Sequence, residues 1–403
     1  MSTSYFTKGA TLFLLTNHFP YSTQENFLED EIVYLSSFFN SIYILPKEGG
    51  SFKRSVPDNC FVLPPLNLNN KGRISYLLHG FFSLKTIASS YRDFIDGSVW
   101  KNKKRLHSWL SEVLQLNNLQ KSRELKHALS LINDEDLIYS YWGTDLIKIA
   151  LLYNGNAKMV SRFHGAWDLW EESYGGYFPF RKQIVSKLSK AFFISQIGET
   201  YFTKRYTCDT AFSPLGSNDH GLGPSKTSDI TQIVSCSTIY PLKRVDLIFR
   251  TLESKRGIKI HWTHLGGGPQ YDYLCALVKK ATNPDLKVTL LGQVSHDAVM
   301  DYYKNHHVDV FINLSTNEGV PVSIMEASSF GIPVVATDVG ATREVVGNDV
   351  GILVSPDPSI SEISSAIDTV LVADLAPRNY WKHHYDAKTN YTAFVNSLKK
   401  LLQ

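Results

Sequence analysis

The chain has 403 residues, too many for one ordinary domain, so two domains are expected. Its 43% hydrophobic and 20% charged residues are typical of a globular protein, and its net charge of +3 gives no reason to expect nucleic acid as a partner. The four cysteines form no Cys-x-x-Cys pair, which favours reduced thiols in a cytosolic protein.

The chain starts with one short apolar run, residues 11–15, which is too short to span a membrane and lacks the pattern of a signal peptide. We interpret residues 12–17 as a first buried strand. A loop at 18–24 and a helix from about Glu25 follow it.

The region 51–130 is basic, with thirteen Lys or Arg against five Asp or Glu. Aromatic and aliphatic residues alternate with these charges, which predicts amphipathic helices with basic faces. Such faces suit a membrane surface or an acceptor on an anionic lipid diphosphate, and they suit plain solvent equally well. Nucleic acid is a poorer interpretation because no recognised binding motif is present.

Further strands alternate with helical segments through both halves of the chain, which predicts parallel sheets covered on both faces. Ligands of such sheets bind beyond the carboxyl ends of the strands, a rule that points to 142–144 and 162–165. The expected strands are 41–45, 61–63, 137–141, 159–164, 192–195, 232–237, 258–265, 287–291, 309–315 and 333–337.

The Gly, Ser, Pro and Asp content of 213–229 predicts an interdomain linker. We therefore expect an N-terminal domain at 1–215, a linker at 216–229 and a C-terminal domain at 230–375. The tail, 376–403, has aromatic residues at helical spacing and is assigned to the N-terminal domain.

Lys243 and Arg244 lie on a loop between a strand and a helix, where a cation is slightly disfavoured by the helix dipole and suits a nearby anion. The glycine-rich turn 266–269 ends another strand, but no G-x-G-x-x-G fingerprint follows it. Asp134, Glu135 and Asp136 have an Asp-x-Asp form, yet they precede a strand, which favours a solvated turn over a metal site.

The segment 315–346 contains two carboxylates, Glu318 and Glu326, and predicts a strand, loop, helix and strand. Two glutamates alone would be taken as solvated acids. The helix expected from Val322 offers unpaired N–H groups to a phosphate, and carboxylates accept hydrogen bonds from hydroxyls. Phosphates in the middle and hydroxyls at both ends describe a nucleotide sugar.

This segment resembles the Glu-x7-Glu region of the retaining glycosyltransferases of family 4, which have the two-lobed GT-B fold. The residues that carry the resemblance are Glu318, Gly319, Pro321, Glu326, Ala327, Gly331, Pro333, Val334 and Gly340. The resemblance implies two Rossmann-like doubly wound parallel-sheet domains facing a central cleft, with C-terminal helices that cross back to the N-terminal domain.

The resemblance also implies donor-site roles. Lys243 would bind the diphosphate, Glu318 the sugar hydroxyls and Glu326 the ribose. Thr238 stands where the family has an arginine, and Arg244 is a candidate for the missing charge. The other implied donor contacts are Gly267, Gln293, Val294, Gly319, Val320, Pro321, Val322 and Ser323.

On the acceptor side, the resemblance implies that His164, in a His-x-x-Asp-like setting with Asp168, reaches the reacting sugar. Arg162 is a candidate for an acceptor phosphate, and Trp142 follows a strand end. The family's first loop is glycine-rich and this one is not. Either side chains such as Gln24 take part, or the loop stands further from the substrates.

The function implied is metal-independent, cofactor-free hexosyl transfer with retention, in which the leaving phosphate takes the acceptor proton. The expected setting is bacterial surface polysaccharide (O-antigen, lipopolysaccharide or capsule) synthesis in the cytoplasm or on the inner membrane face, with a glycan or polyprenyl-diphosphate acceptor and other assembly enzymes as partners. Two alternatives remain open: a GT-B nucleotide-sugar epimerase, and a non-catalytic sugar-binding partner.

Overall fold

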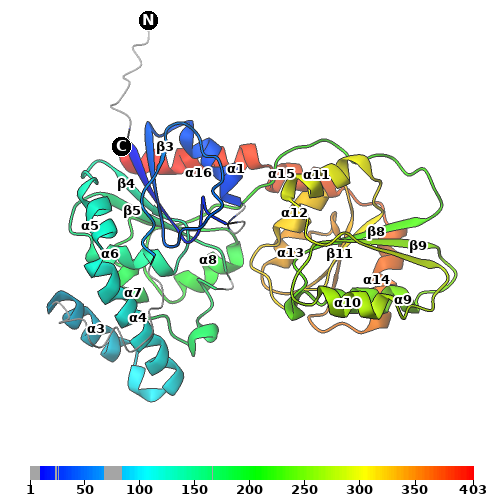
Figure 1. Cartoon of the computed structure of the whole chain (residues 1–403), viewed down its shortest axis with the longest axis horizontal. Helices are drawn as coiled ribbons and strands as arrows, with labels where there is room; N and C mark the ends of the chain where they lie inside the picture. Colours follow the sequence, from blue (N-terminus) through cyan, green and yellow to red (C-terminus); the bar gives the residue numbers. More distant parts are fainter. Residues whose placement is uncertain (1–9, 23–24, 26, 68–83, 166) are drawn as a thin grey trace, which may run out of the picture. The chain divides into compact units, whose positions relative to one another are not determined.

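The computed structural model describes residues 10–22, 25, 27–67, 84–165 and 167–403. The chain divides into two compact units, which are described separately (Figure 1). The first contains residues 1–213 and 391–403, and the second contains 214–390.

The first unit is built on a seven-stranded parallel sheet with the order β3-β2-β1-β4-β5-β6-β7. Its strands are short and apolar because both faces of a parallel sheet are covered. They are β1 (Thr11–Thr16), β2 (Ser41–Pro46), β3 (Cys60–Val62), β4 (Leu137–Ser140), β5 (Lys158–Phe163), β6 (Lys190–Phe193) and β7 (Thr210–Phe212).

Helices cover both faces of this sheet (Figure 1). Alternate residues of β1 point to opposite faces and pack against different helices. Leu12 and Leu14 pack with α1 and α16, whereas Phe13 and Leu15 belong to the core formed with α4 to α8. The helices of this unit are α1 (Phe27–Ser36), α3 (Leu84–Asp96), η1 (Val99–Lys101), α4 (Lys103–Lys121), α5 (Arg123–Ser130), η2 (Asp145–Lys148), α6 (Ile149–Leu152), η3 (Glu171–Tyr174), α7 (Arg181–Val185), α8 (Gln196–Thr203) and the greater part of α16 (Ala387–Leu402).

The second unit has a six-stranded parallel sheet with the order β10-β9-β8-β11-β12-β13. Apolar residues of α9 and α14 pack on one face of it around Trp262, which is fully buried. The strands are β8 (Thr231–Cys236), β9 (Ile260–Leu265), β10 (Leu286–Leu290), β11 (Val310–Asn313), β12 (Val334–Thr337) and β13 (Gly351–Val354). The helices are η4 (Pro241–Lys243), α9 (Val245–Ser254), α10 (Tyr271–Val278), α11 (His296–Asn305), α12 (Val322–Ser329), α13 (Thr342–Val345), α14 (Ile360–Val372) and α15 (Pro377–His384).

The predicted pair of parallel-sheet α/β domains is confirmed, and each expected strand is present within a few residues. Two strands were not predicted, β7 and β13. Both are short and lie at sheet edges, where one neighbour is missing and the sequence needs less apolar character.

The boundaries between the two units differ from the domain boundaries predicted from the sequence. Residues 216–229 belong to the second unit, where Trp381 Nε1 donates to Ser217 Oγ at 2.8 Å and Arg378 bonds Asp219 at 2.6 Å. The helix α15 also belongs there because it packs on α12, so only 391–403 join the first unit instead of 376–403.

Candidate active site

The order of strands in the second sheet changes direction between β8 and β11. From β8 the chain winds outward to β9 and β10, and from β11 it winds the other way to β12 and β13. The loops that leave the carboxyl ends of these two strands diverge at such a point, which is where open α/β sheets bind ligands. The loops concerned are 237–244 and 314–321.

An ion pair joins these two loops. Nζ of Lys243 lies 2.6 Å from Oε1 of Glu318, and the Glu318 side chain is only 12% exposed. Asn313, at the end of β11, donates from Nδ2 to the same oxygen at 3.2 Å. A cation and an acid predicted from separate motifs therefore meet at the switch point, where an incoming diphosphate would compete with Glu318 for Lys243.

The backbone around Glu318 is held by a close approach to Gly340. Gly340 has φ of +55°, and a Cβ at this position would lie 1.8 Å from the carbonyl oxygen of Glu318. The Ala341 amide donates to the Gly319 carbonyl at 3.1 Å. Glycine is required at 340 because both the left-handed conformation and the available space exclude a side chain.

The helix α12 begins at Val322 without a side-chain cap because Pro321 precedes it. The amide of Ile324 donates to the Pro321 carbonyl at 3.1 Å. The N–H groups of Val322 and Ser323 lie at the positive end of the helix dipole, where a negative charge is stabilised. The loop from Gly319 through Val320 thus leads directly from a carboxylate to a helix start.

Glu326 lies on α12 and contacts a residue that the sequence analysis did not single out. Nε2 of His296 is 2.8 Å from Oε1 of Glu326, and the carboxylate is 12% exposed. His296 is the first residue of α11, whose start is capped by Ser295 Oγ on the Ala298 amide at 3.2 Å. The cap fixes the backbone from which the imidazole reaches Glu326.

The Cys236 thiol at the end of β8 interacts electrostatically with both Glu326 and Lys243. Burial and, to a smaller extent, Glu326 raise the pKa of this thiol to about 12, and Lys243 acts in the opposite direction. The second carboxylate and the lysine are therefore electrostatic neighbours of one half-buried thiol at the carboxyl edge of the sheet.

Three loops at this edge contact one another through their backbones. The Ile239 amide donates to the Gly267 carbonyl at 2.8 Å, and the Gly266 amide donates to the Gly292 carbonyl at 3.0 Å. A Cβ at Gly267 would lie 3.0 Å from the amide nitrogen of Gln293. Thr238, Gly267, Gln293 and Val294 are thus brought to one side of the Lys243–Glu318 pair by consecutive strands.

In the first unit, His164 follows the carboxyl end of β5 and packs between two aromatic rings. Its ring centroid is 4.6 Å from that of Tyr141 and 4.4 Å from that of Trp142. Within the described part of the chain, neither ring nitrogen has a hydrogen-bond partner, although Nδ1 lies 3.6 Å from the Asp168 carboxylate. Both nitrogens are buried, so His164 has hydrogen-bonding capacity that the described residues of the first unit do not use.

A second carboxylate, Glu25, organises the loop after β1. It has φ of +58° and accepts the backbone amides of Asn17 at 3.0 Å, His18 at 2.7 Å and Phe19 at 2.6 Å. Trp142 Nε1 also donates to Glu25, at 2.5 Å. The glycine-poor loop is therefore shaped by a buried acid that ties it to the end of β4. Gln24, expected to contact substrate, lies outside the described residues.

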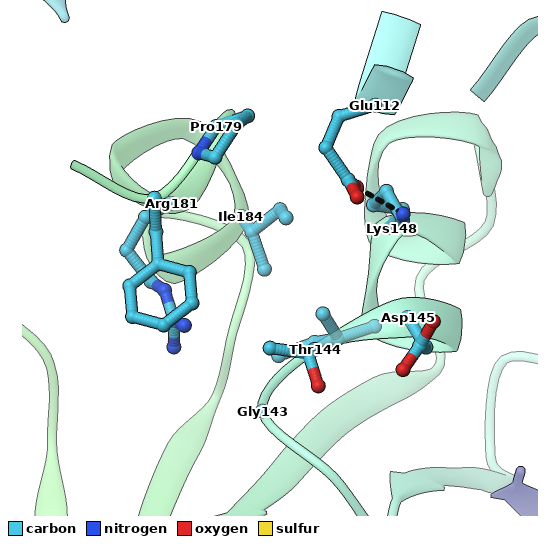
Figure 2. Close-up of a pocket in the computed structure, with 10 residues that line it drawn as sticks. Glu112, Gly143, Thr144, Asp145, Lys148, Pro179, Arg181 and Ile184 are labelled. Atoms are coloured by element: carbon cyan, nitrogen blue, oxygen red, sulfur yellow. Dashed lines mark hydrogen bonds and ion pairs between the residues drawn. The ribbon is translucent and has the colours of Figure 1, made fainter. Parts of the chain in front are cut away.

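A pocket of about 50 Å³ lies in the first unit beside the loop that follows β4 (Figure 2). Asp145 on its wall bonds Lys47 Nζ at 2.5 Å and Asn17 Nδ2 at 3.2 Å. Lys148 on the same wall pairs with Glu112 of α4, as the dashed line in Figure 2 shows. The lining residues are Glu112, Gly143, Thr144, Asp145, Ile147, Lys148, Phe178, Pro179, Arg181 and Ile184.

Residues 224–385 match the family model for glycosyl transferases group 1. This range lies within the second unit and includes Lys243, Glu318 and Glu326. The match covers most of the second unit and none of the first. Within the matched range, the predicted donor residues lie on loops at the carboxyl edge of the sheet or on the helices that follow them.

The chain is also similar to curated proteins over part of its length. It is 31% identical over 134 residues to a phosphatidylinositol N-acetylglucosaminyltransferase subunit from Arabidopsis thaliana, covering 33% of this chain and 29% of that protein. It is 30% identical over 112 residues to the O-antigen biosynthesis glycosyltransferase WbnH from Escherichia coli, covering 28% and 30%. The chain thus spans about a third of the length of the curated relatives it matches.

Solved structures resemble the whole chain, which confirms the GT-B fold class. The lipopolysaccharide outer core galactosyltransferase WaaB has a TM-score of 0.67 at 13% identity, covering 97% of this chain and 99% of that one. Anabaena Alr3699/HepE, solved with UDP and glucose, has a TM-score of 0.65 at 16% identity, covering 96% and 99%.

The structure does not support Arg244 as the second cation for a diphosphate in the second unit. Its Nε donates to the Leu314 carbonyl at 2.6 Å, and its Nη2 donates to the carbonyls of Pro356 at 2.8 Å and Ser315 at 3.3 Å. Nη1 faces Asp357 at 3.3 Å. Arg244 therefore ties the loop after β11 to the segment after β13. With Thr238 uncharged and exposed, Lys243 is the remaining predicted cation.

Two acceptor-side expectations are also corrected. Arg162 is fully buried, pairs with Glu31 and donates to Ser213 Oγ at 2.8 Å, so it stabilises the core and does not reach an acceptor phosphate. Asp168 is likewise buried, and its carboxylate accepts the amides of His164 at 3.0 Å, Gly165 at 2.9 Å and Gly143 at 3.1 Å. Asp168 thus shapes two strand ends and offers no surface to substrate.

Sequence reasoning missed His296 and Glu25 and indicated only the 142–144 edge of the pocket, because each depends on contacts between distant segments. Glu25 lies in a stretch with a helix-like sequence pattern, and nothing in that pattern predicts its positive φ. Among the residues that the structure describes, no cluster of three or more His, Cys, Asp or Glu could hold a metal ion. Over the same residues, no helix is long and apolar enough to cross a bilayer.

Proposed function

We propose that the protein is a retaining, metal-independent hexosyltransferase of family 4 that takes its sugar from a nucleotide-diphosphate donor. One observation carries this proposal: the Lys243–Glu318 ion pair lies at the topological switch point of a group 1 domain. A cation, a carboxylate and an uncapped helix start together match the charges and hydroxyls of a nucleotide sugar.

The donor is proposed to be a UDP-sugar. Alr3699/HepE, which shares the fold, was solved with UDP-glucose, and several curated relatives are named as N-acetylglucosaminyltransferases. Lys243 and the start of α12 would stabilise the leaving diphosphate, which gains negative charge as the bond to the sugar breaks. Glu318 would accept sugar hydroxyls, and Glu326, held by His296, would accept ribose hydroxyls. Gln293 and Val294 would flank the base.

Retention would follow from attack on the same face of the sugar from which the phosphate leaves. The leaving phosphate oxygen takes the proton of the acceptor hydroxyl as the new glycosidic bond forms, so the step balances without a protein base, a metal or a cofactor. His164, whose ring nitrogens lack partners among the described residues, would bond a hydroxyl of the reacting sugar. Trp142 would form a wall of the acceptor site.

The acceptor is proposed to be a glycan on a polyprenyl diphosphate, in the synthesis of a bacterial O-antigen or capsule. Relatives named for O-antigen biosynthesis support this class of pathway. The reaction would take place in the cytoplasm, on the inner face of the membrane, next to other enzymes that assemble the polysaccharide.

A transfer screen in EDTA tests the proposal. The full chain is incubated with UDP-, GDP-, ADP- and CMP-sugars, including UDP-N-acetylglucosamine, and with lipid-diphosphate glycans. Mass spectrometry follows released nucleotide and lengthened acceptor. Lys243→Ala should lower turnover on the order of 10²–10³-fold, and Glu326→Ala should weaken use of the donor. Lys279→Ala, a matched loss of charge on an exposed side chain, should change neither.

Three outcomes would overturn the proposal. Turnover only when a divalent metal is supplied would exclude the metal-independent mechanism. Conversion of the nucleotide sugar without acceptor would indicate the epimerase. Nucleotide-sugar binding without turnover across the panel would indicate the non-catalytic partner, and the missing arginine at Thr238 would then mark a lost activity.

A further inference from the structure

We infer that α3, η1 and the first half of α4 form a surface that docks on an anionic lipid bilayer. This surface, called here the α3–α4 surface, is defined by six large apolar side chains that are 38–69% exposed. They are Ile87, Tyr91, Ile95, Trp100, Leu106 and Leu110.

The helix α3 is amphipathic, but it exposes its apolar side and buries its polar side. Ile87, Tyr91 and Ile95 are spaced four residues apart, lie on one stripe, and are 50%, 69% and 47% exposed. Among the α3 residues whose side chains the structure describes, the buried ones are polar: Thr86, Ser90 and Asp93 are 2%, 6% and 3% exposed. A helix on a protein surface normally buries its apolar stripe and exposes its polar one. The outward stripe of α3 therefore indicates an apolar partner.

The polar side of α3 is anchored to the first unit, so the outward stripe is held in place. Thr86 Oγ1 donates to Gln120 Oε1 of α4 at 2.6 Å, and the Tyr177 hydroxyl donates to the Asp93 carboxylate. Burial raises the pKa of Asp93 to about 6. Rotating α3 to hide Ile87, Tyr91 and Ile95 would break both bonds and leave buried polar groups unpaired.

The apolar stripe continues into the next two elements. Trp100 in η1 is 55% exposed and lies 5.7 Å from Phe94 between ring centroids. Leu106 and Leu110 are one turn apart on α4 and are 38% and 47% exposed. Because α3, η1 and α4 pack against one another, these side chains belong to neighbouring elements and not to scattered sites. Figure 1 shows α3 and α4 together at one end of the first unit.

The charges near the stripe complement an anionic surface. Arg92, Lys101, Lys103 and Lys104 are exposed cations within the same segment. Of the two acids between Ile87 and Leu110, Asp93 is buried, and Asp96 is 3.8 Å from Arg92 and 4.0 Å from Lys182. Trp and Tyr favour the boundary between headgroups and acyl chains, and Lys and Arg favour anionic headgroups.

A second copy of the chain fits this surface less well than a bilayer. A two-fold dimer would place the α3–α4 surface against itself, so Lys101, Lys103 and Lys104 of both copies would be brought into one interface. A lipid bilayer supplies acyl chains for the apolar stripe and anionic headgroups for the cations at once.

The surface and the pocket share a helix. Glu112, which lines the pocket, follows Leu110 by two residues on α4. Docking would hold the pocket close to acceptors that are anchored in the bilayer, and this consequence rests on the proposed function. Membrane binding can be measured without turnover, so a failure of the membrane-binding inference can be distinguished from a failure of the proposed function.

Vesicle flotation tests the inference with the full-length protein. We expect binding to phosphatidylcholine vesicles that contain phosphatidylglycerol, and weak binding to phosphatidylcholine alone. Replacing Lys101, Lys103 and Lys104 by Gln should weaken binding on the order of 10²-fold, since each basic residue contributes about fivefold. Replacing Ile87, Tyr91 and Ile95 by Ser should reduce binding at both low and high salt, because the apolar contribution is not screened.

Matched controls lie in the second unit. The triple exchange of Leu222, Tyr273 and Val372 to Ser removes apolar groups that are 48–85% exposed, and Lys279→Gln with Lys280→Gln removes exposed cations. Both controls should float like the unchanged protein. Near-UV circular dichroism and UDP titration check folding of every variant.

Three results would overturn the inference: no flotation of the unchanged protein with anionic vesicles at low salt, flotation of both α3–α4 variants at the level of the unchanged protein, or loss of binding in the controls. Light scattering adds a further outcome. A dimer that the Ile87, Tyr91 and Ile95 exchange dissociates, with no lipid binding, would assign the surface to self-association instead.

Discussion

Nε2 of His296 lies 2.8 Å from Oε1 of Glu326, so the first residue of α11 orients a carboxylate on α12. In the proposed donor site, this contact uses one carboxylate oxygen and leaves the other for a ribose hydroxyl. His296 would therefore act as a positioning residue.

Removing His296 should raise the KM for the donor several-fold and change kcat little, because ribose binding is equal in the ground and transition states. His296→Asn should restore part of the loss by donating from its amide, whereas His296→Ala should not. Steady-state kinetics with varied donor checks this. Equal donor KM for the Ala variant and the unchanged protein would exclude the positioning role.

The Lys243–Glu318 pair predicts opposite effects on nucleotide binding and turnover. Glu318→Gln frees Lys243, so UDP without sugar should bind equally well or a few-fold more tightly, while transfer falls. Lys243→Ala should weaken UDP binding and lower kcat on the order of 10²–10³-fold. Calorimetric titration of UDP alongside transfer assays separates the two. Weaker UDP binding in Glu318→Gln would contradict the competition proposed here.

Gly340→Ala should destabilise the second unit and weaken donor binding. The new Cβ would clash with the Glu318 carbonyl in a left-handed conformation, at a cost of roughly 2–5 kcal/mol in unfolding free energy. Gly257 has φ of +77° with no neighbouring atom within 4 Å, so Gly257→Ala should cost only about 1–2 kcal/mol and leave donor binding intact. Urea unfolding and UDP titration compare the two variants.

Arg162→Met should destabilise the first unit by about 3–5 kcal/mol, because it leaves the Glu31 carboxylate buried without its cation. The double variant Glu31→Gln/Arg162→Met should recover part of this loss. Lys190→Met breaks the more exposed pair with Asp209 and should cost at most about 1 kcal/mol. Chemical denaturation measures all three, and an undiminished stability of Arg162→Met would show that the buried pair is dispensable.

The buried His264 should make the second unit less stable in acid. Burial lowers the pKa of His264 to about 4, while Ser235 Oγ lies 2.8 Å from Nδ1 and the Ser237 carbonyl lies 3.2 Å from Nε2. In the unfolded chain the His264 imidazole binds a proton near pH 6.5, whereas in the folded chain it binds one only near pH 4. Stability is therefore complete above pH 6.5 and is lost as the pH falls through this window.

The expected loss between pH 7.5 and pH 5 is about 2 kcal/mol in unfolding free energy. Denaturation at both pH values, compared between the unchanged protein and His264→Gln, isolates this term because all other titrating groups are common to both. The same pH slope in both proteins would assign the acid sensitivity elsewhere.

The sequence by itself determined the class of fold and identified the segments that meet at the carboxyl edge of the second sheet. Buried parallel strands need continuous apolar runs, so β1, β8 and β11 could be predicted from local composition. Lys243 and Glu318 lie on segments that follow strands, and Glu326 lies on the helix α12. The Gly and Pro residues that bound these segments are local features as well. Such features are visible in a linear sequence because their causes lie within a few residues.

Only the tertiary structure decided what each charged side chain contacts. Arg162 and Arg244 are of a residue type that often binds anionic ligands. Instead, Arg162 donates hydrogen bonds within the core of the first unit, and Arg244 donates to loop carbonyls. His296 became part of the site because α11 and α12 bring it within hydrogen-bond distance of Glu326, thirty residues away in sequence. Side-chain pairing follows from distances between elements, which depend on how the whole sheet packs, and no local pattern encodes them.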